Sequence, residues 1–425
     1  MALWKAKLTI AAMAAVGFFS ASAQAQNCED LPNPIYIAGS SASQAVWTHV
    51  GPILFDAGTT LVYQNQGSCT GVDYIETNVT DPLSTTNGVS GTGIYFPGTS
   101  ADGGTSACTI APTGGATVEA VDVGISDVFE STCDAVGGTS NPGNVGNFNG
   151  PTQVMLFLQP REASITTHEI SAEEAFYVLG YSGGGMVSPW NQAEENNSTA
   201  GMGYLAIRNS ASGTQSMIGG AVALPPALFL GINEGSTGNV INALKGVVTT
   251  SAPNPQSYLG IAVAGNYDTQ RASLQALAFR AYGQPYAWLP DTSDTTFDKQ
   301  NARQGLYPIS GPMQFLYNTA AADGSGAPTD PKATQLINVM NGTTALAGTT
   351  IVDAEIAAST IPDCAMGVSR PDNNYYSLVP NDRAHSCDCY FNSKVTGSST
   401  TCTACSASSP CVGGYCGANG VCEAF

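Results

Sequence analysis

The chain has 425 residues, with 13 Lys and Arg against 32 Asp and Glu, so its formal net charge at pH 7 is −19. A surface this acidic argues against nucleic acid and anionic membranes as partners, because both carry negative charge themselves. Hydrophobic residues make up 43% of the chain, which is ample for a core, and a chain of about 400 residues usually forms two or three domains or lobes.

The first 25 residues have the pattern of a signal peptide. Lys5 and Lys7 precede the apolar run Leu8–Phe19, and the small residues that follow suit cleavage after Ala25, with Ala23 as second choice. The alternative is a buried helix, but the apolar run is too short to span a bilayer and ends like a cleavage site. We therefore expect an exported protein, periplasmic or extracellular, with no membrane insertion after signal cleavage.

All 12 cysteines follow the predicted signal peptide and would meet an oxidising compartment. The C-x-x-C spacing near the C-terminus also suits a zinc site, but in an exported chain disulfides are the better interpretation. We predict that residues 376–425 form a small cysteine-rich tail that disulfides hold, since it has too few hydrophobic residues for a core of its own. The pairing stays open. The cysteines are Cys28, Cys69, Cys108, Cys133, Cys364 and seven between Cys387 and Cys422.

The N-terminal part alternates short apolar strands with small-residue loops. Ile35–Ala38 is predicted as a strand, and the apolar spacing after it predicts a helix with Val46 and Val50 on its buried face, together with Ile53 and Leu54. Leu61–Tyr63 is a second predicted strand. Residues 77–116 are rich in Gly, Ser and Thr, which favours a surface insertion tied down by Cys108.

The same alternation continues downstream. Val121–Asp127 has strand character, and Val154–Leu158 reads as a buried strand because its apolar run is continuous. Ser171 and Glu174 have the spacing of a capping box that opens a helix. Leu205–Ile207 is a further strand, followed by a helix predicted from Thr214 to Ala223. Strands that alternate with helices predict an α/β fold with mainly parallel sheets.

Four loops built of Gly, Ser and Thr follow four of these strands. In a parallel α/β sheet ligands sit at the carboxyl ends of strands, where helix N-termini offer free N–H groups and a partial positive charge. Such loops bind an anion without many cations, which reconciles an acidic protein with an anionic ligand. Each loop alone is more often a plain turn, as Arg208 alone is a surface ion-pair residue and Asp127 alone an N-cap.

In combination the four loops resemble a known family, the bacterial phosphate-binding proteins, which are the periplasmic receptors of the phosphate ABC transporter. The resemblance spans about residues 35–331 and does not reach the tail. Softer likeness lies at Ser188–Asn191 and at Gln304–Ile309. The four segments are Ala38-Gly39-Ser40-Ser41, Tyr63-Gln64-x-x-Gly67-Ser68, Val121-Asp122-x-Gly124-x-Ser126-Asp127 and Arg208-x-x-x-Ser212-Gly213-Thr214, in the order in which the family has them.

The resemblance implies a two-lobed periplasmic-binding-protein fold. Lobe I would hold residues 26–158 and 308–375, with the insertion 77–116, and lobe II residues 159–307. It implies a binding protein rather than an enzyme, with phosphate or a related oxyanion as ligand, an ABC permease as a candidate partner, and no cofactor or metal. The implied ligand contacts are Ser41, Ser68, Asp127, Arg208, Ser212, Gly213 and Thr214.

Each implied contact has a physical role of its own. Arg208 offers a planar fork of donors to two oxygens of a tetrahedral anion, and the Ser and Thr hydroxyls add further donors. Gly213 lets a backbone N–H approach closely. An ionised Asp127 only accepts hydrogen bonds, so it favours an anion that carries a proton, as HPO₄²⁻ does and sulfate does not.

Two positions depart from the family pattern and leave alternatives open. Ser210 stands where the family usually has an acidic residue, and Ala42 where it has an aromatic one, so arsenate, a phosphonate or an organic phosphate remain candidate ligands. A secreted phosphatase is less favoured, because His49, His168 and His385 lie outside the four loops and no metal motif is present. An extracellular adhesion or matrix protein that retains the binding fold is the other alternative.

Overall fold

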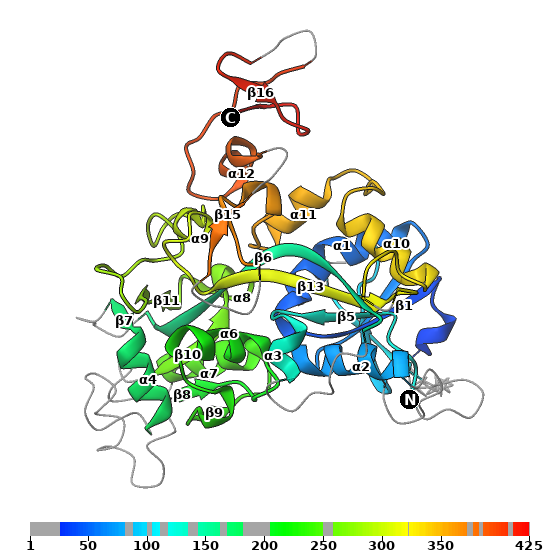
Figure 1. The fold of residues 1–425 in the computed structure, drawn as a ribbon, viewed down its shortest axis with the longest axis horizontal. Helices are drawn as coiled ribbons and strands as arrows, with labels where there is room; N and C mark the ends of the chain where they lie inside the picture. Colours follow the sequence, from blue (N-terminus) through cyan, green and yellow to red (C-terminus); the bar gives the residue numbers. More distant parts are fainter. Residues whose placement is uncertain are drawn as a thin grey trace, which may run out of the picture.

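The structure is a computed structural model that describes residues 26–80, 88–99, 104–110, 118–134, 143–161, 168–181, 205–249, 258–321, 323–371, 377–381, 386–406 and 411–424. They form two α/β lobes side by side, with the C-terminal segment projecting from the body (Figure 1). The predicted signal peptide, 1–25, and Ser188–Asn191 lie outside the described residues. Within the described ranges, no helix has both the length and the apolar composition needed to cross a membrane.

One mixed sheet of 11 strands runs through both lobes. Its strands are β1 (Pro34–Gly39), β2 (Thr60–Gln64), β3 (Gly91–Tyr95), β4 (Ser106–Ile110), β5 (Val123–Ser126), β6 (Val145–Pro160), β8 (Leu205–Ile207), β9 (Ile232–Asn233), β10 (Leu259–Val263), β11 (Leu274–Ala276) and β13 (Ser310–Asn318). The order is β4-β3-β2-β1-β5-β13-β6-β10-β8-β9, with β11 also paired to β6. In the first lobe β1 pairs in parallel with β2 and β5, and in the second β8 pairs in parallel with β9 and β10.

Two antiparallel strands, β6 and β13, carry the chain between the lobes. The first part of β6 pairs with β13, whereas Met155–Leu158 in its second part pairs with β10. The apolar run Val154–Leu158 is fully buried there, so the predicted strand exists but belongs to an element of 16 residues. The lobe boundaries predicted at residues 158 and 308 fall inside β6 and just before β13.

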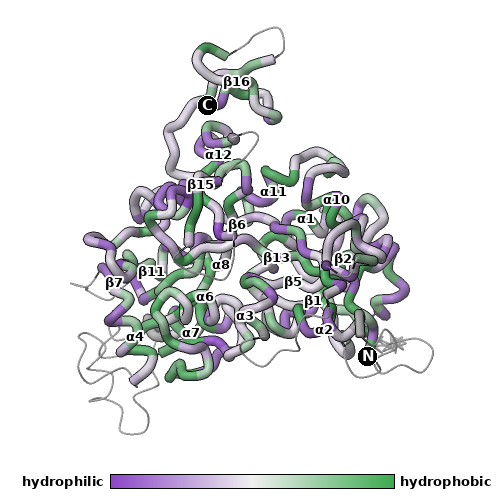
Figure 2. Tube along the Cα trace, viewed as in Figure 1, coloured by the Kyte–Doolittle hydropathy of each residue, from purple (hydrophilic) through white to green (hydrophobic). Residues whose placement is uncertain are grey.

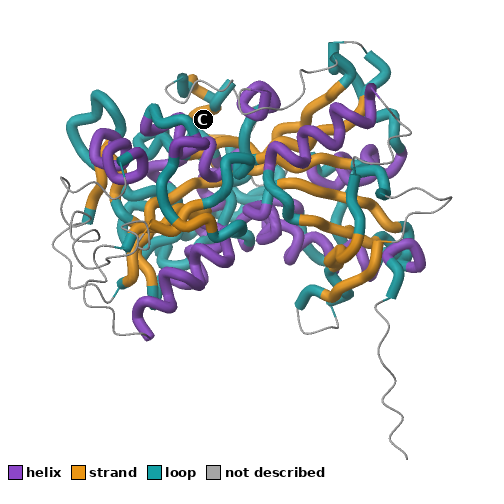
Figure 3. Tube along the Cα trace, turned by 90° about the horizontal axis from the view of Figure 1, so that it is seen from below, coloured by secondary structure: helices purple, strands orange, loops and turns teal. Residues whose placement is uncertain are grey.

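Helices flank the strands of both lobes (Figure 3). The predicted capping box is confirmed: Ser171 Oγ accepts from Glu174 N at 3.1 Å, and Glu174 Oε2 accepts from Ser171 N at 2.7 Å. The helices are α1 (Gln44–Asp56), α2 (Ser68–Thr80), α3 (Glu130–Asp134), α4 (Ala172–Gly180), α6 (Gly213–Val222), α7 (Thr237–Thr249), α8 (Ala264–Tyr267), α9 (Gln300–Arg303), α10 (Pro331–Met340), α11 (Ile351–Ala357) and α12 (Asp388–Lys394).

The core follows the apolar faces that the sequence predicts. On α1, Val46, Val50 and Leu54 are buried, whereas Ile53 is half-buried at the edge. Trp47 lies on the same face and meets Phe315 of β13 edge-on, with ring centroids 5.8 Å apart. Figure 2 shows hydrophobic segments in the interior and hydrophilic ones mostly on the outer turns. The α/β architecture predicted from the sequence is therefore confirmed.

The described parts of the segment predicted as a surface insertion, residues 77–116, include the end of α2 and two strands. β3 and β4 form a hairpin that pairs with β2 and extends the sheet at its edge, and Phe96 is buried against α1. Gly, Ser and Thr dominate the composition, so the hairpin lacks the apolar alternation by which strands are usually recognised. The predicted anchor is present, because Cys108 on β4 is bonded to Cys28.

All 12 cysteines form disulfides, as predicted in place of zinc. Cys364–Cys387 ties the tail to the body, and α12 packs its buried Phe391 into the main core, so only the part after α12 projects in Figure 1. Two-stranded sheets complete the fold: β7 (Glu169–Ser171) with β12 (Ala278–Arg280), β14 (Val368–Ser369) with β15 (Val379–Pro380), and β16 (Gly414–Cys416) with β17 (Cys422–Ala424). The remaining disulfides are Cys69–Cys133, Cys389–Cys402, Cys405–Cys416 and Cys411–Cys422.

Candidate functional site

The four small-residue loops meet where the two lobes face each other. They follow β1, β2 and β5 in the first lobe and β8 in the second. The carboxyl ends of β1, β2 and β5 lie at one edge of the sheet because these strands are parallel. Across the interface, Arg208 Nη2 donates to Ser41 Oγ at 3.0 Å. A Cβ atom on Gly213 would lie only 2.3 Å from Ser68 Oγ and 2.8 Å from Asp127 Cβ, so this position accepts no side chain without movement. The structure thus brings the predicted contact residues together.

Asp127 directly follows β5 at its carboxyl end and is 3% exposed. Its carboxylate accepts from Ser40 Oγ at 2.5 Å and from Ser68 Oγ at 3.4 Å, and its own N–H donates to Ser68 Oγ at 3.1 Å. Burial raises the pKa of Asp127 to about 6, against the lowering effects of the Ser40 bond and the Arg208 charge. The group is therefore an acceptor above about pH 6 and a donor below it.

Arg208 follows β8 and is buried to 2% exposure. Its Nε donates to Gly235 O at 3.2 Å and its Nη1 to Thr237 Oγ1 at 2.6 Å, in addition to the bond to Ser41. Burial lowers the pKa of Arg208 to about 10, so it stays charged near neutral pH. A guanidinium has five N–H donors, and three are used within the described part of the chain. One N–H on each terminal nitrogen remains for an external acceptor.

Two helices, one from each lobe, begin at the same point. In the first lobe α2 begins at Ser68, and in the second α6 begins at Gly213, with Ser212 as its N-cap accepting from Gln215 N at 3.4 Å. Thr214, in the first turn of α6, is fully buried, and its Oγ1 has no hydrogen-bond partner among the described residues. A buried hydroxyl without a partner is costly unless something else satisfies it.

Several residues of the site were not predicted from the sequence. Ser40 bonds Asp127, Thr237 orients Arg208, and Gln215 Oε1 accepts from Arg208 N at 2.9 Å. Tyr63 donates from its hydroxyl to Ser40 O at 2.5 Å and so fixes the first loop. Ser40 and Tyr63 stand inside quoted segments, whereas Thr237 opens a helix that no motif singles out.

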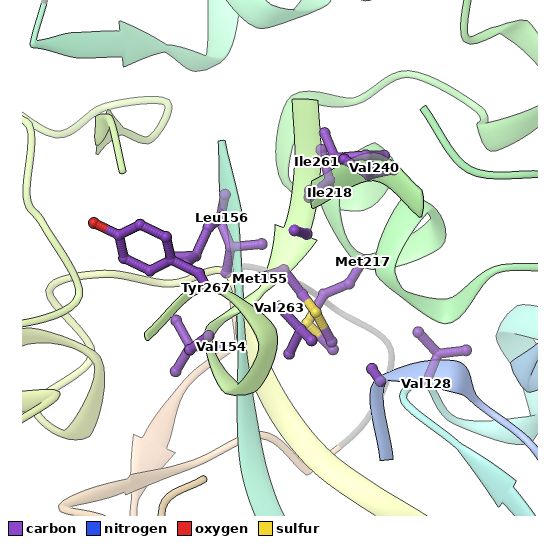
Figure 4. Packing of buried hydrophobic residues seen from close by; sticks show 14 of the residues in the cluster. Val128, Val154, Met155, Leu156, Met217, Ile218, Val240, Ile261, Val263 and Tyr267 are labelled. Atoms are coloured by element: carbon purple, nitrogen blue, oxygen red, sulfur yellow. The ribbon is translucent and has the colours of Figure 1, made fainter. Parts of the chain in front are cut away.

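Buried apolar residues adjoin the polar groups of the site. Val128 directly follows Asp127, and Met217 stands on α6 of the other lobe; both belong to one buried cluster with Met155 and Val263 (Figure 4). Val128 and Met217 border a small cavity together with Asp127, so this carboxylate has apolar neighbours that lower the local dielectric.

The histidines and the one candidate metal-ligand set of the described ranges lie outside the four loops. The only three-residue set of possible metal ligands there is Cys405, Cys411 and Cys422, and all three are in disulfides. His49 lines a cavity that Ser41 also borders, and burial lowers its pKa. His168 borders a separate cavity, and His385 lies outside the described residues.

Comparisons with known proteins give structural likeness at low sequence identity. No family model and no curated protein matches the sequence. An ABC-type phosphate transport receptor from Vibrio cholerae is 13% identical, with 78% of this chain and 100% of that chain covered and a TM-score of 0.43. A Clostridium perfringens structure described as a phosphate ABC transporter substrate-binding protein with bound phosphate is 10% identical, with 78% and 99% covered and a TM-score of 0.45. The OxyR regulatory domain from Pseudomonas aeruginosa is 8% identical, with 68% and 91% covered and a TM-score of 0.33.

Proposed function

We propose that the protein is a solute-binding protein that captures phosphate, or a similar tetrahedral oxyanion, between its two lobes. The observation that carries this proposal is the meeting of a buried guanidinium with spare N–H groups, a buried unpartnered hydroxyl and two helix N-termini at one point. All of these groups donate hydrogen bonds or present positive potential, which is the chemistry that an oxyanion requires.

Asp127 supports phosphate over sulfate within this class. Above about pH 6 it is ionised and can only accept, so it pairs with the P–OH proton of HPO₄²⁻ and repels the unprotonated oxygens of sulfate. In a site that binds unprotonated dianions, a buried carboxylate at this position would only repel the ligand.

The test is calorimetric titration of phosphate and of sulfate at pH 7.5. Phosphate is expected to bind and sulfate to bind much more weakly. In Asp127→Asn the amide can donate as well as accept, so selectivity should fall more than phosphate affinity does. Equal affinity of the wild type for the two anions would contradict the assignment of Asp127. Absence of binding by either would favour the adhesion or matrix alternative, and release of phosphate from an aryl phosphate would favour the phosphatase.

We further propose that the protein is exported and serves ABC-type uptake. Six disulfides suit an oxidising compartment, and the N-terminal pattern supplies the export signal. N-terminal sequencing of the protein from its native cell should begin at Gln26. A protein that keeps residues 1–25 would contradict export by this route.

A further inference from the structure

A cavity adjoins the oxyanion site at Ser41. Its volume is about 430 Å³, which falls in the range of about 300–1,000 Å³ that small-molecule sites occupy. Both lobes line it: α1 of the first lobe contributes Gln44 and Thr48, and α7 and α8 of the second contribute Asn242 and Asn266.

The cavity and the oxyanion site share a wall. Ser41 lines the cavity, and its hydroxyl accepts from Arg208 Nη2. Ser236 also lines it, and both neighbours of Ser236 hold the same guanidinium, Gly235 through its carbonyl and Thr237 through its hydroxyl. Arg208 itself does not line the cavity, and Ser41 is the predicted contact residue that touches both the guanidinium and the cavity.

The lining is polar and almost uncharged. It consists mostly of hydroxyl and amide side chains and contains no carboxylate. Its one ammonium group, Lys245 Nζ, already donates to Gln270 Oε1 at 2.7 Å. Asn266 is half-buried and lines the cavity, whereas its Oδ1 is buried away from solvent without a hydrogen-bond partner among the described residues. The lowered pKa of His49 leaves its imidazole neutral near pH 7. Such a wall suits a neutral, hydroxylated group rather than a second anion or an apolar ring.

We propose that the protein binds phosphomonoesters of small polyols, with the phosphoryl group at Arg208 and the polyol in the cavity. This inference rests on the proposed oxyanion site and extends it to the organic phosphates that the Ala42 position leaves open. It is a binding step only: no bond of the ester breaks.

Binding of the ester requires a protonated Asp127, which binding of inorganic phosphate does not. A monoester has its second pKa near 6, so at pH 7.5 it is a dianion without a P–OH proton. It would face the ionised carboxylate with bare oxygens, unless Asp127 takes up a proton. Ester binding at pH 7.5 should therefore consume about one proton, whereas binding of HPO₄²⁻ should consume none.

The experiment is calorimetric titration of inorganic phosphate, sn-glycerol 3-phosphate and phenyl phosphate at pH 7.5, in two buffers of different ionisation enthalpy. Glycerol phosphate should bind about tenfold or more tighter than phenyl phosphate, and only the esters should show proton uptake. Asn266→Leu should weaken glycerol phosphate about tenfold, the effect of one neutral hydrogen bond, and leave inorganic phosphate unchanged.

Gln275→Leu is the matched control, because Gln275 lines a separate cavity and also has a buried amide nitrogen without a partner among the described residues. This substitution should change the affinity for neither inorganic phosphate nor glycerol phosphate. Phosphate binding without glycerol phosphate binding would overturn this inference and leave the oxyanion site intact, as would equal binding of the two esters. If none of the three ligands binds, the proposed function itself is overturned.

Discussion

Two sets of buried charges in this molecule are built in different ways. One, which we call the ion-pair cluster, consists of Asp268, Arg271, Asp291 and Lys299 in the second lobe. Both acids contact both bases, at N–O distances from 2.5 to 3.1 Å, so its formal charges cancel. Lys299 is only 1% exposed. Every charge in this cluster forms ion pairs with oppositely charged side chains of the protein, which is the arrangement expected of a structural element.

The other set, Arg208 and Asp127, is as deeply buried but unpaired. Among the described residues no ion pair joins the two side chains, and their partners are hydroxyls and a backbone carbonyl. Thr214 beside them keeps a hydroxyl without a partner. The two charges act on each other only at a distance, so within the described ranges neither has a carboxylate or guanidinium in direct contact, and this arrangement suits a site where a ligand supplies the missing contacts. The two sets therefore differ in direct contact between opposite charges, which the ion-pair cluster has and the pair Arg208 and Asp127 lacks.

The largest stability effect is expected in the ion-pair cluster. Lys299→Met removes one base and leaves two buried carboxylates to share Arg271, which should lower the free energy of unfolding by about 3–5 kcal/mol. Chemical denaturation measures the loss. The control is Lys332→Met, whose half-buried ammonium lies 3.8 Å from Asp122 and should matter by less than about 1 kcal/mol. Phosphate affinity of folded Lys299→Met should match wild type; a large loss would break the distinction between the two sets.

Asp127 should make stability depend on pH. Because its folded pKa is raised to about 6 from 3.8, the folded state keeps a proton that the unfolded state has lost between these values. The contribution of Asp127 to stability is thus highest below pH 4 and falls as pH rises to 6, by on the order of 3 kcal/mol. The difference in unfolding free energy between wild type and Asp127→Asn, measured at pH 4 and pH 7, should show this fall. A difference that stays constant with pH would mean that the carboxyl titrates normally.

The smallest effect concerns the unpartnered hydroxyl. Thr214→Val keeps the shape of the side chain and removes one donor, so phosphate affinity should drop about tenfold, while stability should hold or rise because an unsatisfied group is gone. Thr214→Ser should restore the affinity. If Val at this position lowers stability and leaves affinity unchanged, Thr214 serves the fold rather than the ligand.

Much of this arrangement was predictable because strand, loop and helix follow one another in a readable order. The helix after Leu205–Ile207 was predicted from Thr214 to Ala223 and spans Gly213–Val222. The full length of β6 was not predictable, because polar residues such as Asn147 and Asn149 break the apolar run before Val154.

Other features have no local signal at all. The six pairings of 12 cysteines depend on tertiary contacts between distant segments, as with Cys28 and Cys108, which are 80 residues apart. Thr237 reaches Arg208 only because α7 packs beside β8, and a lone threonine at a helix start is ordinarily just a cap.

The central claim is that Arg208 provides the charge that holds an oxyanion. Titration of phosphate into wild type, Arg208→Ala and the control Arg161→Ala tests it most directly, because Arg161 is 36% exposed and lies 3.9 Å from Asp294, away from the proposed ligand. Truncation of a buried charged contact costs about 2–5 kcal/mol, so Arg208→Ala should lose roughly 30-fold to several-thousand-fold in phosphate affinity, and Arg161→Ala should lose none. Unaltered phosphate affinity in a folded Arg208→Ala protein would contradict the account.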